Sequence, residues 1–456
     1  MKINAILSVA AALLLVACTS QPSVIKTPVP PREAGQQDMI QFAADPIADV
    51  GIGVVGLGMR GSDAVERLSF VPGCHVAAVC DVEADRAEES LRYLQNKGLS
   101  ANVYSGEEES YKALCEDPSV DLVYVCTDWL HHVPVALYAM EHGKHVAIEV
   151  PSAETLQACW DLVNTSERTR RHCLILENCC YDFFELTALT MAQEGLFGDV
   201  IHAEGAYNHN LDPYWKRYWN NWRLEFNSQH RGDLYPTHGF GPVCQVLNIH
   251  RGDRLTTLVS MDTDSFNGGK HARAAGMENK PFAGGDVTMT MLRTAKGKTI
   301  LIEHDVVTPR PYSRMYQLVG TDGYAAKYPV QEVCLRTEGA ENVDYQNLGG
   351  EKTLRGDSLQ ELMARYRNPI LTPELEAMAK EVGGHGGMDF IMDYRMVYCL
   401  NNGLPLDMDV YDLAEWCCVT ELSRISLENG GMPVEVPDFT RGAWNRVQGF
   451  SYAFAE

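Results

Sequence analysis

Short runs of apolar residues, many of them β-branched, alternate with longer amphipathic stretches from residue 49 to about residue 178. The runs are typical of buried strands, and the stretches between them repeat apolar residues at helical spacing. Strands that alternate with helices form βαβ units and a parallel sheet. The pattern therefore predicts an α/β domain over residues 49–178, with strands at "VGIGVVG", "HVAAVC", "LVYVC", "HVAIEV" and "CLILEN".

The N-terminus has a different pattern. Lys2 precedes an apolar stretch, Ile6 to Val16, that is too short to span a bilayer. It leads into "LVAC", which ends at Cys18 and resembles the lipobox of bacterial lipoproteins, where the cysteine is acylated. Residues 1–18 are then a lipoprotein signal peptide through the lipidated Cys18; the alternative is an ordinary signal peptide with a chance cysteine. Residues 19–48, rich in proline, are predicted to be a flexible linker.

Composition limits the classes of partner. A chain of 456 residues with 45% hydrophobic content can bury the cores of two domains. The 38 basic and 61 acidic side chains leave a net charge of −23, which repels phosphate backbones and argues against nucleic acid as a partner. After the signal region no apolar run approaches the roughly 20 residues of a membrane span, so a soluble mature body is expected.

The 14 cysteines form neither a compact disulfide framework nor a pattern of metal ligands. Most lie inside apolar strings, as Cys80 and Cys126 do, and are predicted to be buried free thiols. The neighbouring pairs Cys179–Cys180 and Cys417–Cys418 lack the spacing of a zinc site. No structural metal is predicted.

A glycine-rich turn follows the first predicted strand. Gly56, Gly58 and Gly61 have the spacing that allows a tight turn and a close approach of the backbone to a pyrophosphate at a helix N-terminus. Asp81 ends the next strand, about 20 residues farther on, where a carboxylate accepts hydrogen bonds from a ribose. Because an acid repels a 2′-phosphate, NAD is favoured over NADP. The alternative is a glycine-rich turn in a relative that has lost its ligand.

Two further strand ends point to the same crevice. Thr127 to His132 follow one buried strand, and Glu149 and Val150 follow the next. The carboxyl ends of parallel strands line the ligand crevice of an open α/β sheet. Either histidine, His131 or His132, taken alone, fits an ordinary helix start better.

Taken as a whole, the chain resembles the Gfo/Idh/MocA family of sugar-handling NAD(P) proteins and, more closely, glycoside hydrolase family 109, the NAD-dependent α-N-acetylgalactosaminidases. The resemblance runs from about Gly51 to Trp444. It is carried by "GLGMRG", "ENCCY", "EGLFGDVIHAEGAYNHNL", "GDLYPTHGFGP", "RPY", "GGHGGMDF" and "DVYDLAEWCCVTELS". It implies an N-terminal Rossmann domain and, over residues 179–456, a substrate-binding α/β domain with a largely antiparallel open sheet. The C-terminal helical segments from about residue 386 are expected to pack back against both domains.

The resemblance also implies a mechanism. In this family NAD is thought to act as a built-in catalyst: C3 of the sugar is oxidised, the C1 substituent is eliminated across C1–C2, water adds, and C3 is reduced again. This is the NAD-dependent exception to hydrolysis by two carboxylates. Many dehydrogenases of the wider family carry Glu-Lys-Pro, whereas this chain has Glu149-Val150-Pro151. The missing lysine favours the hydrolase. A cofactor restored in each turnover would also suit an exported protein.

The site residues carry over from the family by position. The cofactor contacts implied by the resemblance, together with the glycine turn and Asp81, are Met59, Arg60, Trp129, Leu130, His131, His132, Glu149, Val150 and Asn178. The implied substrate contacts are Tyr207, Arg223, Tyr235, Pro236, Thr237, His238 and Tyr312. Tyr207 on a predicted strand also fits an ordinary cross-strand aromatic residue.

Sugar oxidation needs a base near neutral pH, and His238 is the choice for O3. A histidine beside a proline-containing turn is also often structural, but the polar, tightly turned "GDLYPTHG" favours the functional interpretation. Tyr235, Tyr181 and Tyr312 are candidates for proton transfer at C2 or for orienting the sugar, and the sequence does not rank them. Arg223 offers a fork of donors to hydroxyl or acetamide oxygens. His385, among glycines, is interpreted as helix-start architecture and left out of the site.

Three functional hypotheses follow. The first is a lipid-anchored glycosidase of the bacterial cell envelope that removes terminal α-linked N-acetylgalactosamine, or a related hexosamine, from glycans. The second is an NAD-dependent sugar oxidoreductase on the same scaffold. The third is a non-catalytic glycan-binding lipoprotein. In relatives the second domain's sheet often mediates oligomerisation, so the resemblance makes a homo-oligomer plausible.

Overall fold

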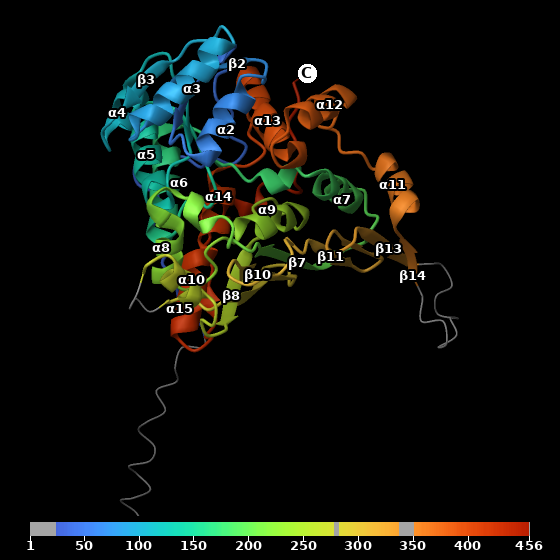
Figure 1. The fold of residues 1–456 in the computed structure, drawn as a ribbon. Coiled ribbons are helices and arrows are strands. Elements are labelled where there is room, and N and C mark those ends of the chain that lie inside the picture. Colours follow the sequence, from blue (N-terminus) through green and yellow to red (C-terminus); the bar gives the residue numbers. More distant parts are fainter. Residues whose placement is uncertain (1–23, 278–281, 337–350, 456) are drawn as a thin grey trace, which may run out of the picture.

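A six-stranded parallel sheet forms the centre of the N-terminal half (Figure 1). The computed structural model describes residues 24–277, 282–336 and 351–455. The strands are β1 (Val50–Val55), β2 (Cys74–Asp81), β3 (Asn102–Ser105), β4 (Leu122–Val125), β5 (His145–Ile148) and β6 (Cys173–Ile175). Neighbouring strands are parallel, in the order β3-β2-β1-β4-β5-β6. This is the doubly wound order of dinucleotide-binding domains, as the sequence predicts.

Helices cover both faces of this sheet, and the central strands are buried as a result. They are α2 (Met59–Leu68), α3 (Ala84–Asn96), α4 (Ser110–Glu116), α5 (Trp129–Glu141) and α6 (Leu156–Thr169). The sequence pattern missed β3, because this edge strand is only partly covered and has no apolar run. Each predicted strand overlaps an observed one, and β2 extends one residue beyond its prediction at both ends.

The C-terminal half is built on a nine-stranded sheet in the order β14-β13-β12-β11-β7-β10-β9-β8-β15. The strands are β7 (Val200–Asn208), β8 (Leu255–Asp262), β9 (Thr288–Thr294), β10 (Thr299–Asp305), β11 (Gln317–Gly320), β12 (Gly323–Ala326), β13 (Glu332–Arg336), β14 (Glu351–Leu354) and β15 (Val434–Glu435). Only β7 and β10 are parallel neighbours, so the expected largely antiparallel sheet is confirmed. Buried and exposed residues alternate along β9, which shows that one face of the sheet is open.

Most of the remaining helices lie along this sheet or between the two halves, whereas α12 lies beside α13 (Figure 1). They are η1 (Asn178–Tyr181), α7 (Phe183–Gln193), η2 (Trp215–Arg217), η3 (Trp219–Asn221), α8 (Trp222–Gln229), α9 (Thr237–Val246), α10 (Gly268–Ala274), α11 (Gly356–Arg365), α12 (Pro373–Val382), η5 (His385–Gly387), α13 (Met388–Asn402), α14 (Val410–Cys417), α15 (Val419–Glu428) and η6 (Ala443–Asn445). Helix α13 contacts α2 and η1, and α14 contacts α6, β6 and α9. The expected return of the C-terminal helices to both domains is confirmed.

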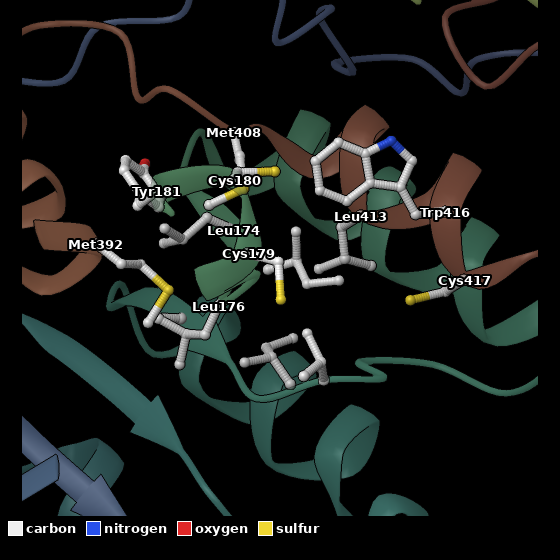
Figure 2. Packing of buried hydrophobic residues seen from close by; sticks show 14 of the residues in the cluster. Leu174, Leu176, Cys179, Cys180, Tyr181, Met392, Met408, Leu413, Trp416 and Cys417 are labelled. Atoms are coloured by element: carbon white, nitrogen blue, oxygen red, sulfur yellow. The ribbon is translucent and has the colours of Figure 1, made fainter. Parts of the chain in front are cut away.

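The packing of this junction is apolar and rich in sulfur. Figure 2 shows Leu174 and Leu176, at the end of the parallel sheet, beside Met392 of α13, with Leu413 and Trp416 of α14 nearby. Each of these side chains is almost fully buried. The two halves therefore share a core, which fixes the position of the crevice between them.

Residues 24–48 differ from the flexible linker expected from their composition. Ile25 forms a bridge with Val434 beside the last strand, and the Met39 amide donates a hydrogen bond to the Tyr411 hydroxyl. Arg32 pairs with the fully buried Glu167 at 3.0 Å. A buried carboxylate needs such a partner, so the segment is held to the body by polar contacts between residues far apart in the sequence. Residues 19–23, and Cys18, lie outside the described residues.

The 13 cysteines among the described residues are all unpaired, as predicted, and most are buried. Within the described ranges no helix has the length and apolarity to cross a bilayer.

Candidate active site between the two domains

A cavity of about 1280 Å³ lies where the carboxyl ends of the parallel strands face the second sheet. Pockets for drug-sized ligands measure roughly 300–1,000 Å³, so this one has room for a dinucleotide and a sugar together. Of the side chains predicted from sequence, the cavity is lined by Met59, Arg60, Asp81, Trp129, His131, His132, Glu149, Val150, Asn178, Tyr207, Arg223, Tyr235, His238 and Tyr312. The structure thus brings most of the predicted site together.

The glycine turn fits a pyrophosphate. Gly56 has a φ of +89°, and a Cβ there would lie 2.7 Å from the Cys126 carbonyl group. A Cβ on Gly61 would lie 1.7 Å from the Gly56 oxygen. Gly58 differs, because its φ is an ordinary −68° and a Cβ would meet nothing within 4 Å. The backbone at Gly58 is therefore open on the side of the cavity, which leaves room for a pyrophosphate at the N-terminus of α2.

Asp81 anchors the far end of this turn. Its two carboxylate oxygens accept hydrogen bonds from the amides of Leu57, at 2.6 Å, and Glu83, at 2.8 Å. These bonds fix the carboxylate at the end of β2, on the cavity wall, where the sequence places the ribose. The residues present therefore fit a dinucleotide without a 2′-phosphate.

A network of charges closes the middle of the cavity. Arg60 contacts Glu149 at 2.7 Å and Asp389 at 3.1 Å, and the Asn178 amide donates to the other oxygen of Asp389. Burial alone would raise the pKa of Asp389, but Arg60, His385 and Arg67 together hold it well below its usual range. The glycine turn, the end of β5 and the start of α13 are thereby joined beside the cofactor cavity.

The residues at the start of α5 that were predicted to contact the cofactor differ in where their side chains lie. Trp129 is buried against Trp222, and His131 pairs with Asp128, which raises the pKa of His131 to about 9 despite partial burial. His132 lies with its ring nitrogens 2.9 Å and 3.1 Å from the backbone oxygens of Pro151 and Thr127, so it ties two strand ends together. Leu130 is 64% exposed and does not line the cavity, so its predicted cofactor role is wrong for the side chain. Its place on the outward side of α5 explains this.

His238, on the wall of the cavity, forms a pair with a buried carboxylate. Nδ1 of His238 lies 2.7 Å from Oε1 of Glu177, which is fully buried. Burial alone would raise the pKa of Glu177, but the neighbouring His238 and its hydrogen bonds lower it, so Glu177 is a carboxylate that accepts the Nδ1 proton. The Nε2 atom of His238 is then left for the cavity.

Close helix–sheet packing sets the position of His238. A Cβ on Gly239 would lie 2.1 Å from the Ala206 nitrogen, so only glycine lets the first turn of α9 rest on β7. This contact brings the His238 ring to 5.4 Å from that of Tyr207, measured between centroids. Glu177 comes from the end of β6, so the pair spans the two domains.

Cys179 completes the set of potential metal ligands with Glu177 and His238, the one such group of three among the described residues. Burial raises the pKa of the Cys179 thiol well above its usual value, and a protonated thiol is a poor ligand. The other two groups are already engaged with each other through the hydrogen bond between Nδ1 of His238 and Oε1 of Glu177.

An aromatic wall around a buried cation faces this pair. The rings of Tyr207 and Tyr235 stack with centroids 4.2 Å apart, and the Arg223 guanidinium lies 4.9 Å from the Tyr235 ring. Among the described residues no carboxylate pairs with Arg223, and its buried Nε has no partner. Burial raises the pKa of Tyr207 to about 12, against the opposing effect of Arg223, and that of Tyr235 well above its usual value. The wall thus offers neutral phenols and an unneutralised cation, a set suited to sugar oxygens.

Tyr312 forms the opposite side of this wall. Its hydroxyl accepts a hydrogen bond from Arg314 at 3.2 Å, and Arg314 is held by Asp182 at 3.1 Å and Glu185 at 2.6 Å. The His209 ring lies between Tyr312 and Tyr207, and its Nδ1 is 2.9 Å from the Tyr207 hydroxyl. Burial, assisted by Arg223, lowers the pKa of His209 to about 4, so it is a neutral imidazole at neutral pH.

Besides Leu130, the predicted site residues Tyr181, Pro236 and Thr237 do not line the cavity. Tyr181 belongs to the buried core, next to Cys180 and Met408 in Figure 2, and its hydroxyl donates to Asp407 at 3.0 Å. The prediction of a catalytic Tyr181 is therefore wrong: η1 turns Asn178 to the cavity and Tyr181 away from it. Pro236 and Thr237 are buried at the start of α9 and do not line the cavity, so they support His238 from behind.

The structure adds residues that the sequence interpretation left out. His385 lines the cavity, with Nδ1 2.8 Å from Asp389, and it has a φ of +47° between glycines that also have positive φ. It is both part of the helix start and part of the site. A histidine in a strained, glycine-rich loop was the available signal. Glu177 had none, because its role comes from a contact with a residue 61 positions away.

Two family models cover this architecture. Residues 50–176 match the "Oxidoreductase family, NAD-binding Rossmann fold" model, and residues 181–446 match the "Glycosyl hydrolase 109, C-terminal domain" model. A "Glycosyl hydrolase family 109 protein 1" from Bacteroides thetaiotaomicron is 58% identical over 439 residues, which cover 95% of this chain and 94% of the relative. The chain belongs to glycosyl hydrolase family 109. A family 109 protein from Porphyromonas gingivalis is 54% identical over 455 residues and covers 99% of this chain and 97% of its own length.

Solved structures agree on the fold of this family 109 protein. A levoglucosan dehydrogenase in complex with NADH and L-sorbose has a TM-score of 0.64 at 17% identity, covering 86% of this chain and 100% of that one. The apo scyllo-inositol dehydrogenase from Lactobacillus casei has a TM-score of 0.60 at 13% identity, with coverage of 86% and 99%. The family 109 protein is an enzyme with an NAD-binding Rossmann domain and a mixed, mostly antiparallel second domain, and NAD is its cofactor.

Proposed function

We propose that this enzyme is a glycosidase that releases terminal α-linked N-acetylgalactosamine, or a related hexosamine, by oxidation at C3 and elimination at C1. The observation that carries the proposal is the His238–Glu177 pair, 2.7 Å apart, on the wall of the cavity that also contains the glycine turn and Arg223. A buried base beside a redox cofactor suits oxidation of a carbinol, whereas hydrolysis by two carboxylates needs neither.

Proton transfer at O3 is assigned to His238. Because the Glu177 carboxylate accepts the Nδ1 proton, Nε2 is free to accept the proton of the sugar hydroxyl, and Glu177 then stabilises the imidazolium. NAD, when bound, supplies a reversible two-electron acceptor for C3. Arg223 and the phenols of Tyr235 and Tyr312 hold sugar oxygens by donating hydrogen bonds, since burial keeps both phenols protonated.

The later steps need a second proton-transfer group. A ketone at C3 acidifies the C2 proton. A base on the cavity wall accepts this proton as the C1 oxygen leaves; water then adds at C1, and a proton returns to C2. The structure supplies His385, backed by Asp389 at 2.8 Å, on the rim of the same cavity. We assign His385 to protonating the leaving oxygen and deprotonating the water, because its exposed side chain reaches both solvent and cavity.

The main rival is an NAD-dependent sugar oxidoreductase. Many dehydrogenases of the wider family use a lysine directly after the glutamate for proton transfer. In this chain that position is Val150, whose side chain cannot donate or accept a proton. Glu149 is moreover engaged by Arg60. The third hypothesis, a glycan-binding lipoprotein without activity, does not explain why a buried carboxylate is kept beside His238.

The cellular setting is part of the proposal. We infer acylation at Cys18, attachment to the bacterial cell envelope and a glycan as the partner, all from the sequence features of residues 1–18. Metabolic labelling with a palmitate analogue tests the anchor: label on the wild-type chain and none on Cys18→Ala is expected. Equal labelling of both would contradict it.

The activity is tested by nitrophenol release from p-nitrophenyl α-N-acetylgalactosaminide, using a chain that starts after Cys18, purified with its cofactor and assayed without added NAD. Release over many turnovers is expected, because each turnover restores the cofactor. Accumulation of reduced cofactor with an oxidised sugar and no nitrophenol would favour the oxidoreductase. Binding of the sugar with neither product would favour the glycan-binding protein.

A further inference from the structure

An aromatic segment, Tyr214 to Trp222, connects β7 to α8 and lines one side of the cavity. It contains two short helical turns, η2 and η3, that meet α8 at Asn220 and Asn221. Both asparagines have positive φ, 50° and 54°. Asparagine tolerates this left-handed conformation better than most residues, and consecutive positive φ values mark a backbone held in a specific shape.

The inner side chains of this segment are anchored to the sugar-facing wall. Tyr214 packs edge-on against His209, with ring centroids 5.4 Å apart, and Trp222 packs against Trp129 at 5.3 Å. The Tyr218 hydroxyl accepts a hydrogen bond from Arg223. The segment is therefore a continuation of the site that binds the terminal sugar.

Two other side chains of the segment face the cavity without a comparable partner. Trp219 lines the cavity, is 40% exposed, and makes no ring contact within the described part of the chain. Arg217 also lines the cavity; its guanidinium lies 5.4 Å from the Tyr214 ring, and no described carboxylate pairs with it. In a chain with a net charge of −23, an arginine left without an acid at a cavity rim is notable.

We propose that Trp219 and Arg217 form a subsite for the second sugar of the glycan, the ring attached through the scissile oxygen. The C–H face of a pyranose would stack on the exposed indole, and Arg217 would donate to its hydroxyl or carboxylate oxygens. This inference rests on the proposed glycosidase function. We choose a second sugar as the ligand because the segment contacts the wall assigned to the terminal sugar, through Tyr214 on His209 and Tyr218 on Arg223.

The test compares two substrates that differ only beyond C1. α-N-Acetylgalactosaminyl fluoride has a one-atom leaving group that cannot reach Trp219, while N-acetylgalactosaminyl-α-1,3-galactose carries a full second ring. For Trp219→Ala we expect kcat/KM on the disaccharide to fall roughly tenfold and kcat/KM on the fluoride to change less than about twofold. Trp219→Phe, which keeps an aromatic face, should recover part of the loss. Phe70→Ala, at a surface aromatic residue that is 48% exposed and does not line the cavity, is the matched control.

The outcomes separate the subsite from the enzyme's function. If the fluoride is cleaved and Trp219→Ala affects both substrates equally, the subsite is wrong. Loss of bound NAD in Trp219→Ala, measured by absorbance after denaturation, would show that Trp219 contacts the cofactor instead. If neither substrate is cleaved, the glycosidase proposal fails, and calorimetric binding then decides the subsite alone: the disaccharide should bind wild type more tightly than the monosaccharide does, and Trp219→Ala should remove that difference.

Discussion

Two of the three histidine–carboxylate pairs that the described residues form at the cavity, those of His238 and His385, differ in their surroundings. The inner pair, His238 and Glu177, is enclosed: the histidine side chain is 12% exposed and the carboxylate 0%. The outer pair is His385 and Asp389, where the histidine side chain is 56% exposed and the carboxylate is shared with Arg60. The inner histidine is packed on a sheet through Gly239, and the outer one stands in a loop of glycines.

This difference indicates a division of labour. A buried carboxylate that accepts the Nδ1 proton of a histidine fixes the tautomer and orientation of the ring, which suits proton transfer at one defined sugar atom. A solvent-exposed histidine on a glycine-rich loop suits a group that meets leaving groups of different shapes and then a water. A histidine–carboxylate pair thus serves in one place to hold the base in a fixed orientation and in the other to keep the base accessible to solvent and to the leaving group.

The largest effect is expected at the inner pair. His238→Ala should lower kcat roughly 100- to 10,000-fold, because it removes the group that we assign to proton transfer at O3. Nitrophenol release and the amount of bound NAD are measured together. A variant that keeps its NAD and more than about a tenth of its activity would contradict the assignment.

The inner region also contains a buried acid, Asp233, two residues before Tyr235. Burial raises its pKa to about 7, and its one bond is to the Tyr235 amide at 3.2 Å. An acid with a raised pKa favours the fold when protonated, below its unfolded value near 3.8, and loses that contribution as pH rises toward about 7. Asp233→Asn should therefore be more stable than wild type at pH 8, by at most about 4 kcal/mol, and show little difference near pH 4. Urea unfolding at the two pH values measures this; a constant difference would contradict it.

Glu177→Gln should cost less than loss of His238 itself. The amide keeps the shape of Glu177 but no longer stabilises the imidazolium, so kcat should fall roughly 10- to 100-fold while KM and NAD content stay near wild type. Steady-state kinetics separate the two parameters. A rise in KM with unchanged kcat would show that Glu177 shapes the sugar site rather than positioning the base.

His385→Ala should depend on the leaving group, which sharpens the contrast between the pairs. We expect a loss of about tenfold or more on a disaccharide, whose leaving oxygen needs a proton, and a smaller loss on the nitrophenyl glycoside. His238→Ala should affect both substrates equally. If His385→Ala, like His238→Ala, lowered activity by the same factor on the disaccharide and on the nitrophenyl glycoside, the proposed division of labour would be contradicted.

The smallest effect is expected for Tyr181→Phe. The hydroxyl of Tyr181 contacts Asp407, which keeps Arg395 as a partner at 2.7 Å, so the variant should lose only about 1 kcal/mol of stability. Its kcat should match wild type. A loss of activity at unchanged NAD content would return Tyr181 to the reaction.

The sequence predicted what depends on local pattern. The strand, the glycines and Asp81 lie within one βαβ unit, so their spacing determines their arrangement. The prediction of a catalytic Tyr181 failed because it relied on the nearness of Tyr181 to Asn178 in the sequence. Both residues belong to η1, and the turn of this short helix directs Asn178 into the cavity and Tyr181 into the core. The role of Glu177 depends on its contact with His238, and the attachment of residues 24–48 depends on the contact of Arg32 with Glu167. Both contacts join distant segments, so no local sequence pattern predicts them. The sequence shows that His385 lies in an unusual glycine-rich loop. It does not show that the partner of His385, Asp389 of α13, also binds Arg60 of α2 and Asn178 of η1.

Hydrolysis in D₂O tests the central claim most directly. Removal of the C2 proton and later addition of water would place one solvent deuterium at C2 of the released N-acetylgalactosamine, which mass spectrometry and proton NMR detect. The account predicts this label in product formed by wild-type enzyme, and none in the free sugar kept in buffer alone. Release of unlabelled sugar would indicate direct displacement at C1 and contradict the proposed oxidation and elimination.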